Sequence, residues 1–246
     1  SVTAYAVNQW LINGLESNFP LAKWKVLSEE TSKEARLRND LNNADWLWIL
    51  DPLDGTKDFL QGSENYAVHL ALLYKKKPLL GVVLIPEREE LWFGIVGVGS
   101  WSENREGGRQ TATLSGRKDI SELILVSSKN HRNQRLEDLI KVINFAETKE
   151  VGSVGCKIAT ILRGETDVYI SLSGKSAPKD WDMAAPNVVL ASAGGAFTHA
   201  DGQSLIYTNS DNIQSGCLIA SNGKSHTLIC NKAMDFFQSL DCEFKV

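Results

Sequence analysis

Short β-type runs in close succession are the feature of the first half of the chain that most limits its possible folds. They lie at Lys25–Leu27, Trp46–Leu50, Ala67–Tyr74, Leu79–Ile85, Leu91–Val96 and Gln110–Leu114. Strands separated by short turns favour an antiparallel sheet. A helix is predicted before them and ends near Pro20. Its apolar face comprises Ala6, Trp10, Leu11 and Leu15.

The pattern changes after Gly116, where strands alternate with helices. The predicted strands are Leu123–Ser127, Asp167–Leu172 and Cys217–Ser221, and the predicted helices are Arg135–Phe145, Cys156–Leu162, Ala184–Ala193 and Lys224–Leu240. This alternation is typical of an α/β arrangement. We therefore predict a mixed α+β and α/β protein. Its N-terminal half (residues 1–112) holds an antiparallel sheet, and its smaller C-terminal half (residues 113–246) is of the α/β type.

The composition indicates a globular chain that is not dedicated to nucleic acids or membrane surfaces. Of the 246 residues, 43% are apolar and 23% are charged, and the net charge is −4. These values exclude the collagen-like and disordered classes. Proteins that bind nucleic acids or membrane surfaces carry a basic face or run, which this sequence does not show. No apolar stretch reaches the roughly 18–20 residues of a membrane span.

The cysteines and the first ten residues of the chain indicate the cellular compartment in which the protein is expected. Cys156, Cys217, Cys230 and Cys242 are scattered and form no Cys-x-x-Cys pair. We therefore expect buried thiols in a reducing compartment rather than disulfides or a zinc site. Residues 1–10 contain neither a basic leader nor a signal-type apolar block. The predicted location is the cytoplasm or an organelle stroma. The chain starts without Met, and we expect further residues upstream.

The string Asp51-Pro-Leu-Asp54-Gly-Thr56 follows a buried strand and carries the strongest chemical signal. Proline fixes one backbone angle and glycine permits a tight turn. The two carboxylates can therefore converge, with the carbonyl of Leu53 between them. Hard cations such as Mg²⁺ prefer carboxylate and carbonyl oxygens. The alternative interpretation is an ordinary surface turn, since Asp-Gly is frequent in turns.

Two further acidic groups strengthen the metal interpretation. Glu29 and Glu30 follow the strand at Lys25–Leu27, and Asp180 and Asp182 stand at the start of a helix. Each group has a simpler alternative: a solvated loop for the glutamates, and helix capping for the aspartates. One site for two or three Mg²⁺ ions would explain all three acidic groups together.

Taken together, these motifs resemble the inositol monophosphatase superfamily over nearly the whole chain. Its marks are Glu29-Glu30, then the string from Asp51 to Thr56, then Trp181-Asp182-x-Ala-Ala and a following Gly-Gly, in that order. The resemblance implies a layered αβαβα fold and an Mg²⁺-dependent, Li⁺-inhibited phosphomonoesterase. The segments Lys57-Asp58-Phe59, Ser127–His131, Gly152–Lys157 and Asp167–Tyr169 resemble its 3'(2'),5'-bisphosphate nucleotidase branch.

The resemblance also implies roles for individual residues. Thr56, Glu29 and Asp54 would be catalytic, with Thr56 orienting a water molecule that the metals activate. The implied Mg²⁺ ligands are Glu29, Asp51, the Leu53 carbonyl, Asp54 and Asp182. The implied substrate contacts are Asp54, Gly55, Thr56, His131, Ser153, Lys157 and Asp182. Of these, His131 and Lys157 would bind a second phosphate, and the alternatives are a loop histidine and a solvated lysine.

Two departures from the family pattern keep other functions open. The stretch from Ser1 to Asn8 lacks the aspartate of a family Thr-x-x-Asp motif, and residues 170–173 lack an arginine that nucleotidases usually carry. The first hypothesis is hydrolysis of the 3'-phosphate of adenosine 3',5'-bisphosphate, and of 3'-phosphoadenylyl sulfate. The alternatives are an inositol-1-phosphate or sugar-phosphate phosphatase, and a non-catalytic metal- and phosphonucleotide-binding protein. The expected partner is a small phosphorylated molecule, with no nucleic acid and no membrane, and the expected state is a monomer or a homodimer.

Overall fold

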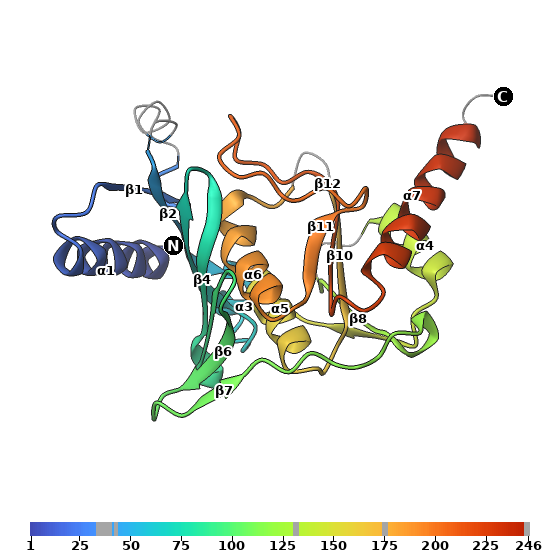
Figure 1. Ribbon diagram of the computed structural model, residues 1–246, viewed down its shortest axis with the longest axis horizontal. Helices are drawn as coiled ribbons and strands as arrows, with labels where there is room; N and C mark the ends of the chain where they lie inside the picture. Colours follow the sequence, from blue (N-terminus) through green and yellow to red (C-terminus); the bar gives the residue numbers. More distant parts are fainter. Residues whose placement is uncertain (33–40, 42–43, 130–132, 174–176, 244–246) are drawn as a thin grey trace.

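Two β-sheets enclose a pair of helices in a layered αβαβα arrangement (Figure 1). The computed structural model describes the chain except for residues 33–40, 42–43, 130–132, 174–176 and 244–246. Helix α1 (Val2–Asn18) covers the outer side of the first sheet, while α4 (Gln134–Ile143) and α7 (His226–Glu243) cover the outer side of the second. The middle layer is formed by α5 (Val154–Leu162) and α6 (Asp180–Ser192). The layered fold expected from the sequence is confirmed.

The first sheet has seven strands in chain order. They are β1 (Trp24–Ser28), β2 (Trp46–Asp54), β3 (Ala67–Tyr74), β4 (Lys77–Ile85), β5 (Glu90–Ile95), β6 (Gly99–Asn104) and β7 (Arg109–Thr111). The prediction of an antiparallel sheet is wrong for one pair, because β1 and β2 are parallel. Parallel neighbours need a connection of about a dozen residues or more, and the chain between Ser28, the end of β1, and Trp46, the start of β2, is long enough for it. Strand β6 was not predicted, because its sequence is mostly polar.

The second sheet has five strands in the order β11-β12-β10-β8-β9. They are β8 (Ile124–Ser127), β9 (Glu147–Glu150), β10 (Val168–Ser173), β11 (Ala196–His199) and β12 (Gly216–Ser221). Strands β9 and β11 were not predicted. All residues of β9 are exposed, so the strand shows no apolar alternation. The division at residues 112 and 113 falls in the connection between the sheets and stays a prediction.

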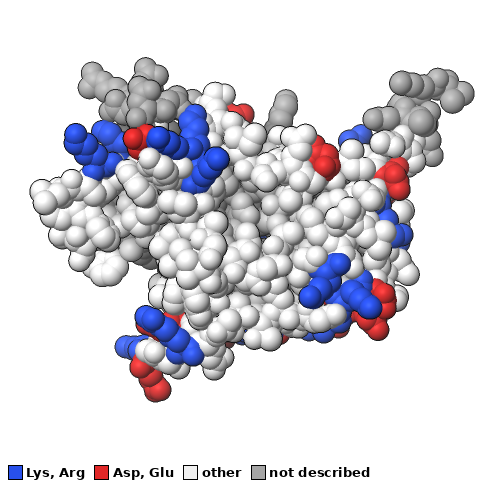
Figure 2. All heavy atoms as spheres, viewed as in Figure 1, with Lys and Arg blue, Asp and Glu red and all other residues white. Residues whose placement is uncertain are grey.

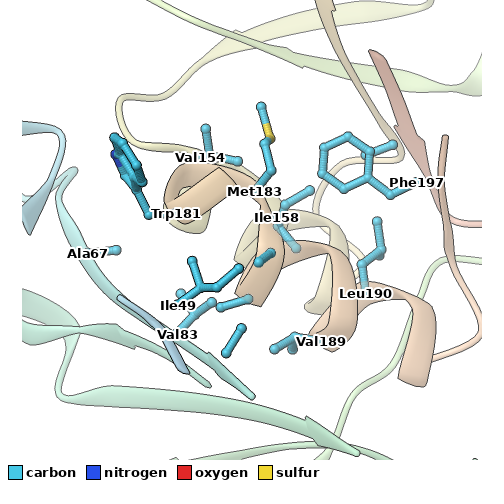
Figure 3. Packing of buried hydrophobic residues seen from close by; sticks show 14 of the residues in the cluster. Ile49, Ala67, Val83, Val154, Ile158, Trp181, Met183, Val189, Leu190 and Phe197 are labelled. Atoms are coloured by element: carbon cyan, nitrogen blue, oxygen red, sulfur yellow. The ribbon is translucent and has the colours of Figure 1, made fainter. Parts of the chain in front are cut away.

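The middle helices are built from small and apolar residues that the two sheets bury. Every residue of α5 is buried, and α6 starts at Asp180, before the predicted Ala184, where the Asp182 carboxylate accepts a hydrogen bond from the backbone N–H of Lys179. Figure 3 shows side chains of this cluster from both sheets and both helices meeting between the layers. They include Ile49, Ala67, Val83, Val154, Ile158, Trp181, Met183, Val189, Leu190 and Phe197. Trp181 is thus a core residue.

Three of the four cysteines confirm the expectation of buried thiols, since Cys156, Cys217 and Cys230 are free and buried.

No helix in the described part of the chain has the length and apolar character needed to cross a membrane. On the face drawn in Figure 2, the described basic side chains lie in small separate groups next to acidic ones. This face therefore offers no continuous basic stripe of the kind that nucleic acids require.

The close seating of α6 on the first sheet depends on glycines in β4 and β5. A Cβ atom at Gly81 would lie 2.7 Å from the carbonyl oxygen of Ala185 and 2.9 Å from the Cβ of Val188. A Cβ at Gly94 would lie 2.8 Å from the Cα of Val189. Since α6 also carries Asp182, these contacts set the position of a candidate site residue.

We predict that Gly81→Ala lowers the free energy of unfolding by about 1–3 kcal/mol, because the added methyl group overpacks a rigid helix–sheet contact. Gly14→Ala is the matched control, since a Cβ there meets nothing within 4 Å. In a helix this exchange stabilises by up to about 1 kcal/mol. Urea unfolding of both variants measures the difference, and equal values for the two would contradict the packing argument.

Candidate active site

Asp51 and Asp54 lie on the same side of the first sheet because β2 is bulged between them. In the ladder with β3, Asp51 pairs with His69 and Asp54 pairs with Ala67, so β2 has one more residue than its partner over this stretch. In a regular strand, residues three apart point to opposite faces. The extra residue restores a common face, and proline is tolerated at such bulges. The expected tight turn is thus a bulged strand end.

Asp182 joins these two carboxylates from a distant part of the chain. It lies in the first turn of α6, where its carboxylate accepts a hydrogen bond from the backbone N–H of Lys179 at 2.6 Å. One carboxylate oxygen from each of Asp51, Asp54 and Asp182 lies within 4.8 Å of the others. We call these residues the aspartate cluster. The capping role weighed for Asp182 is therefore real, and it coexists with membership of the cluster.

Burial and mutual repulsion disfavour the charged forms of the cluster. Asp51 is 1% exposed, and its burial, followed by the charges of Asp54 and Asp182, raises its pKa well above the usual value. Burial and the charge of Asp54 raise the pKa of Asp182 to about 7. A divalent cation would offset this repulsion, and carboxylate oxygens are the ligands that Mg²⁺ prefers. The donor set therefore fits Mg²⁺.

Asp54 is anchored at the N-terminus of α5. Its Oδ2 atom accepts hydrogen bonds from the Ser153 hydroxyl and the Val154 N–H, both at 2.6 Å, and from the Gly155 N–H at 3.3 Å. The N-terminal end of a helix carries partial positive charge, which favours a carboxylate there. Ser153, predicted as a substrate contact, thus holds Asp54 in this structure.

Glu29 lies beside the cluster at the end of β1. Its backbone N–H donates to the carbonyl of Leu50 at 3.1 Å, and its carboxyl group lies close enough to Asp51 for a hydrogen bond when one of the two groups is protonated. Burial and the charge of Glu30 raise the pKa of Glu29. Glu29 is therefore within reach of Asp51, although the three oxygens that lie within 4.8 Å of one another come from the aspartates.

Gly55 and Thr56 begin the short helix α3 (Thr56–Leu60) directly after the bulge. The Thr56 hydroxyl donates to the Leu53 carbonyl at 3.1 Å. Gly55 has a φ of 88°, and a Cβ there would lie 2.8 Å from the carbonyl oxygen of Asn65. Only glycine fits this conformation and this space, so the chain can turn sharply out of β2 into α3.

A cavity of about 560 Å³ opens next to the cluster and contains most of the predicted substrate contacts. Its lining includes Asp54, Gly55, Thr56, Ser153, Lys157, Tyr169 and Asp182. Lys157 is 3% exposed, and its Nζ donates to the Ser153 carbonyl at 2.9 Å. Burial lowers the pKa of Lys157, and the charge of Asp54 acts in the opposite direction. The alternative of a solvated lysine is thus wrong. His131 lies outside the described residues.

Asp180 does not belong to the aspartate cluster. Its carboxylate accepts hydrogen bonds from the backbone N–H of Thr208 at 2.6 Å and from the side chain of Gln214 at 2.7 Å. These contacts hold the segment 206–214 against the start of α6. For this residue the structural interpretation is therefore sufficient.

Sequence reasoning missed one side chain at the site, His69 of β3. It is completely buried, and its Nε2 atom lies 3.4 Å from Oδ2 of Asp54. The signal was present: the alternation of β3 puts His69 on the same buried face as Ala67 and Ala71. A histidine on such a face, two residues from the strand start, needs a polar partner.

We predict that the metal-free protein loses stability relative to an Asp182→Asn variant as the pH rises from about 4 to about 7. The folded-state pKa of Asp182 is about 7, above its ordinary value of 3.8. Between these values the folded state holds a proton that the unfolded state has released. The difference in unfolding free energy then changes by at most about 1.4 kcal/mol per pH unit.

Urea unfolding in EDTA across this pH range measures that difference. The asparagine variant is a suitable reference, because its side-chain oxygen can still accept from the Lys179 N–H. Above pH 7 the difference is expected to level off. A difference that does not change with pH would show that Asp182 ionises normally.

Comparison with known proteins shows the relationships of the chain. The sequence profile of the inositol monophosphatase family matches residues 1–236. The chain is 27% identical over 209 residues to the 3'(2'),5'-bisphosphate nucleotidase CysQ of Buchnera aphidicola, covering 85% of this chain and 74% of that one. It is 29% identical over 199 residues to the Nus factor SuhB of Pseudomonas aeruginosa, covering 78% and 66%.

The structural comparison agrees with the family match. A dual-specific IMPase/NADP phosphatase bound with D-inositol-1-phosphate superposes with a TM-score of 0.75 at 24% identity, over 94% of this chain and 82% of that one. At this identity the likeness establishes the fold. With the family profile matching residues 1–236, the chain belongs to the inositol monophosphatase family, a family of metal-dependent phosphatases.

Proposed function

We propose that the protein is an Mg²⁺-dependent phosphatase that removes the 3'-phosphate from adenosine 3',5'-bisphosphate, and from 3'-phosphoadenylyl sulfate. The observation that carries the proposal is the buried side chain of Lys157, which lines the same cavity as Asp54 and Asp182 of the aspartate cluster. A substrate with two phosphates offers one to the metal site and one to this lysine. The likeness to the nucleotidase CysQ supports the same substrate.

The aspartate cluster, with Glu29 and the Leu53 carbonyl, would hold two or three Mg²⁺ ions. When bound, Mg²⁺ neutralises phosphate charge and lowers the pKa of a water molecule, so that hydrolysis needs no strong protein base. The protein's part is to fix the ligand oxygens. Asp54 is fixed by the α5 amides, and Asp182 by the cap of α6.

The remaining residues would orient the water and the substrate. Thr56, whose hydroxyl already contacts the Leu53 carbonyl, would position the attacking water with Glu29 and Asp54. The sharp turn at Gly55 would let the phosphate approach the backbone N–H groups of residues 55 and 56. Lys157 would donate charge-assisted hydrogen bonds to the second phosphate, which are stronger away from bulk water. The assignment of His131 to the same phosphate stays a prediction.

A phosphatase for inositol 1-phosphate or a sugar phosphate is the second candidate. Besides Lys57 and Lys157, the same cavity is lined by the neutral polar residues Asn133, Ser171 and Ser173. Such groups suit the hydroxyls of a polyol ring. The IMPase/NADP phosphatase of similar fold, bound with D-inositol-1-phosphate, supports this candidate too. In either case the partner is a small phosphorylated molecule, handled by a monomer or homodimer in a reducing compartment.

Phosphate release with Mg²⁺ at neutral pH from adenosine 3',5'-bisphosphate, inositol 1-phosphate and fructose 1,6-bisphosphate separates these functions. We expect the adenine bisphosphate to be preferred and EDTA to abolish turnover. A preference for a polyol or sugar phosphate would be consistent with the proposed metal site but would contradict the proposed adenine-nucleotide substrate. Tight nucleotide binding without turnover of any substrate would instead indicate a non-catalytic binding protein.

We predict that Lys157→Met raises the KM for adenosine 3',5'-bisphosphate by about 10- to 150-fold, because it removes a hydrogen bond to a charged group. The KM for inositol 1-phosphate should change less than threefold, since this substrate has no second phosphate. Lys149→Met, at an exposed position of β9, is the control and should leave both values unchanged. Equal losses for both substrates in Lys157→Met would assign the lysine a structural role.

A further inference from the structure

His69 lies beneath the aspartate cluster and has no part in the mechanism described above. It is completely buried in β3, opposite Asp51 in the ladder with β2. Its Nδ1 atom lies 3.3 Å from the carbonyl oxygen of Trp181, the residue before Asp182. Its Nε2 atom lies 3.4 Å from Oδ2 of Asp54. The ring therefore spans the space between two members of the cluster.

Besides β2 and the start of α6, the N-terminus of α5 also packs against the His69 ring. A Cβ atom at Gly155 would lie 2.3 Å from Nε2 of His69, so this helix presses its backbone directly against the ring. The Gly155 N–H donates to the same Oδ2 atom of Asp54 that Nε2 approaches. Within the described residues, Nε2 has no aligned hydrogen-bond partner of its own. Oδ2 of Asp54 lies 3.4 Å from this nitrogen.

We propose that His69 is a positioning residue of the cation site, whose ring sets the separation between the Asp54 carboxylate and the start of α6. The inference rests on the proposed Mg²⁺-dependent function. Mg²⁺ demands near-ideal ligand geometry, so a small shift of one carboxylate weakens binding. Groups that orient metal ligands from behind typically contribute about 10- to 100-fold in metal affinity or activity.

A packing role alone would make a different prediction. Val83 borders the same space, since its Cγ1 atom would lie 2.8 Å from a Cβ at Gly155, and it is 1% exposed. If the ring only fills volume, removing part of Val83 should disturb the site as much as removing the polar atoms of His69. If the ring positions Asp54, only changes at His69 should weaken cation binding.

The experiment is calorimetric titration of Mg²⁺ into the metal-free full chain without substrate, for the wild type, His69→Leu, His69→Gln and Val83→Ala. We expect about 10- to 100-fold weaker binding for His69→Leu. His69→Gln, which places an amide near the position of Nε2, should recover affinity to within about threefold. Val83→Ala should lose stability in urea while keeping wild-type affinity. At saturating Mg²⁺, the KM of His69→Leu should match the wild type.

Unchanged Mg²⁺ affinity in His69→Leu, or equal losses in Val83→Ala, would overturn the positioning role. If circular dichroism shows that His69→Leu does not fold, His69→Phe is the second variant. It places an aromatic ring without nitrogens at this position, and the same loss of Mg²⁺ affinity is expected of it. A wild type that binds no Mg²⁺ would overturn the proposed function itself. If the wild type binds Mg²⁺ and His69→Leu binds it with the same affinity, this inference alone would be overturned.

Discussion

Three carboxylates with oxygens within 4.8 Å of one another repel each other, and the surrounding structure has to offset this repulsion. Asp54 receives three hydrogen bonds at the N-terminus of α5, and Asp182 receives one from the cap of α6. Asp51 has no such helix end and accepts a hydrogen bond from the Leu53 N–H. These contacts reduce the free energy cost of the charges without removing it. A cation that binds all three would remove most of the rest.

The layered fold brings the three carboxylates together from two separate stretches of chain, β2 and α6, and holds both stretches rigidly. The bulge in β2 turns two aspartates toward the middle layer, and α6 brings the third from the other side. The close approach of α6 depends on missing side chains, as at Gly81, and that of α5 on Gly155. His69 lies where β2, α5 and α6 meet. Small residues in the core thus contribute to the site by fixing distances between carboxylates.

Much of this arrangement could be predicted from the sequence, because strong local patterns determine it. The strand Ala67–Tyr74 was predicted with its observed bounds, since its apolar alternation is regular. The aspartates were found because acids in apolar surroundings are costly. The parallel pairing of β1 with β2 and the bulge at Pro52 depend on how segments return to each other, which local spacing does not encode. His69 was missed because the strand pattern indicates that its side chain is buried but not that Oδ2 of Asp54 lies 3.4 Å from its ring.

The most direct test of the account is a crystal structure with Mn²⁺ in place of Mg²⁺, read by anomalous scattering. The ion is easily located, and it accepts the same oxygen ligands. The account predicts an anomalous peak about 2.0–2.2 Å from carboxylate oxygens of Asp51, Asp54 and Asp182. Mn²⁺ bound elsewhere while these three carboxylates stay unliganded, or no bound ion at millimolar Mn²⁺, would contradict it.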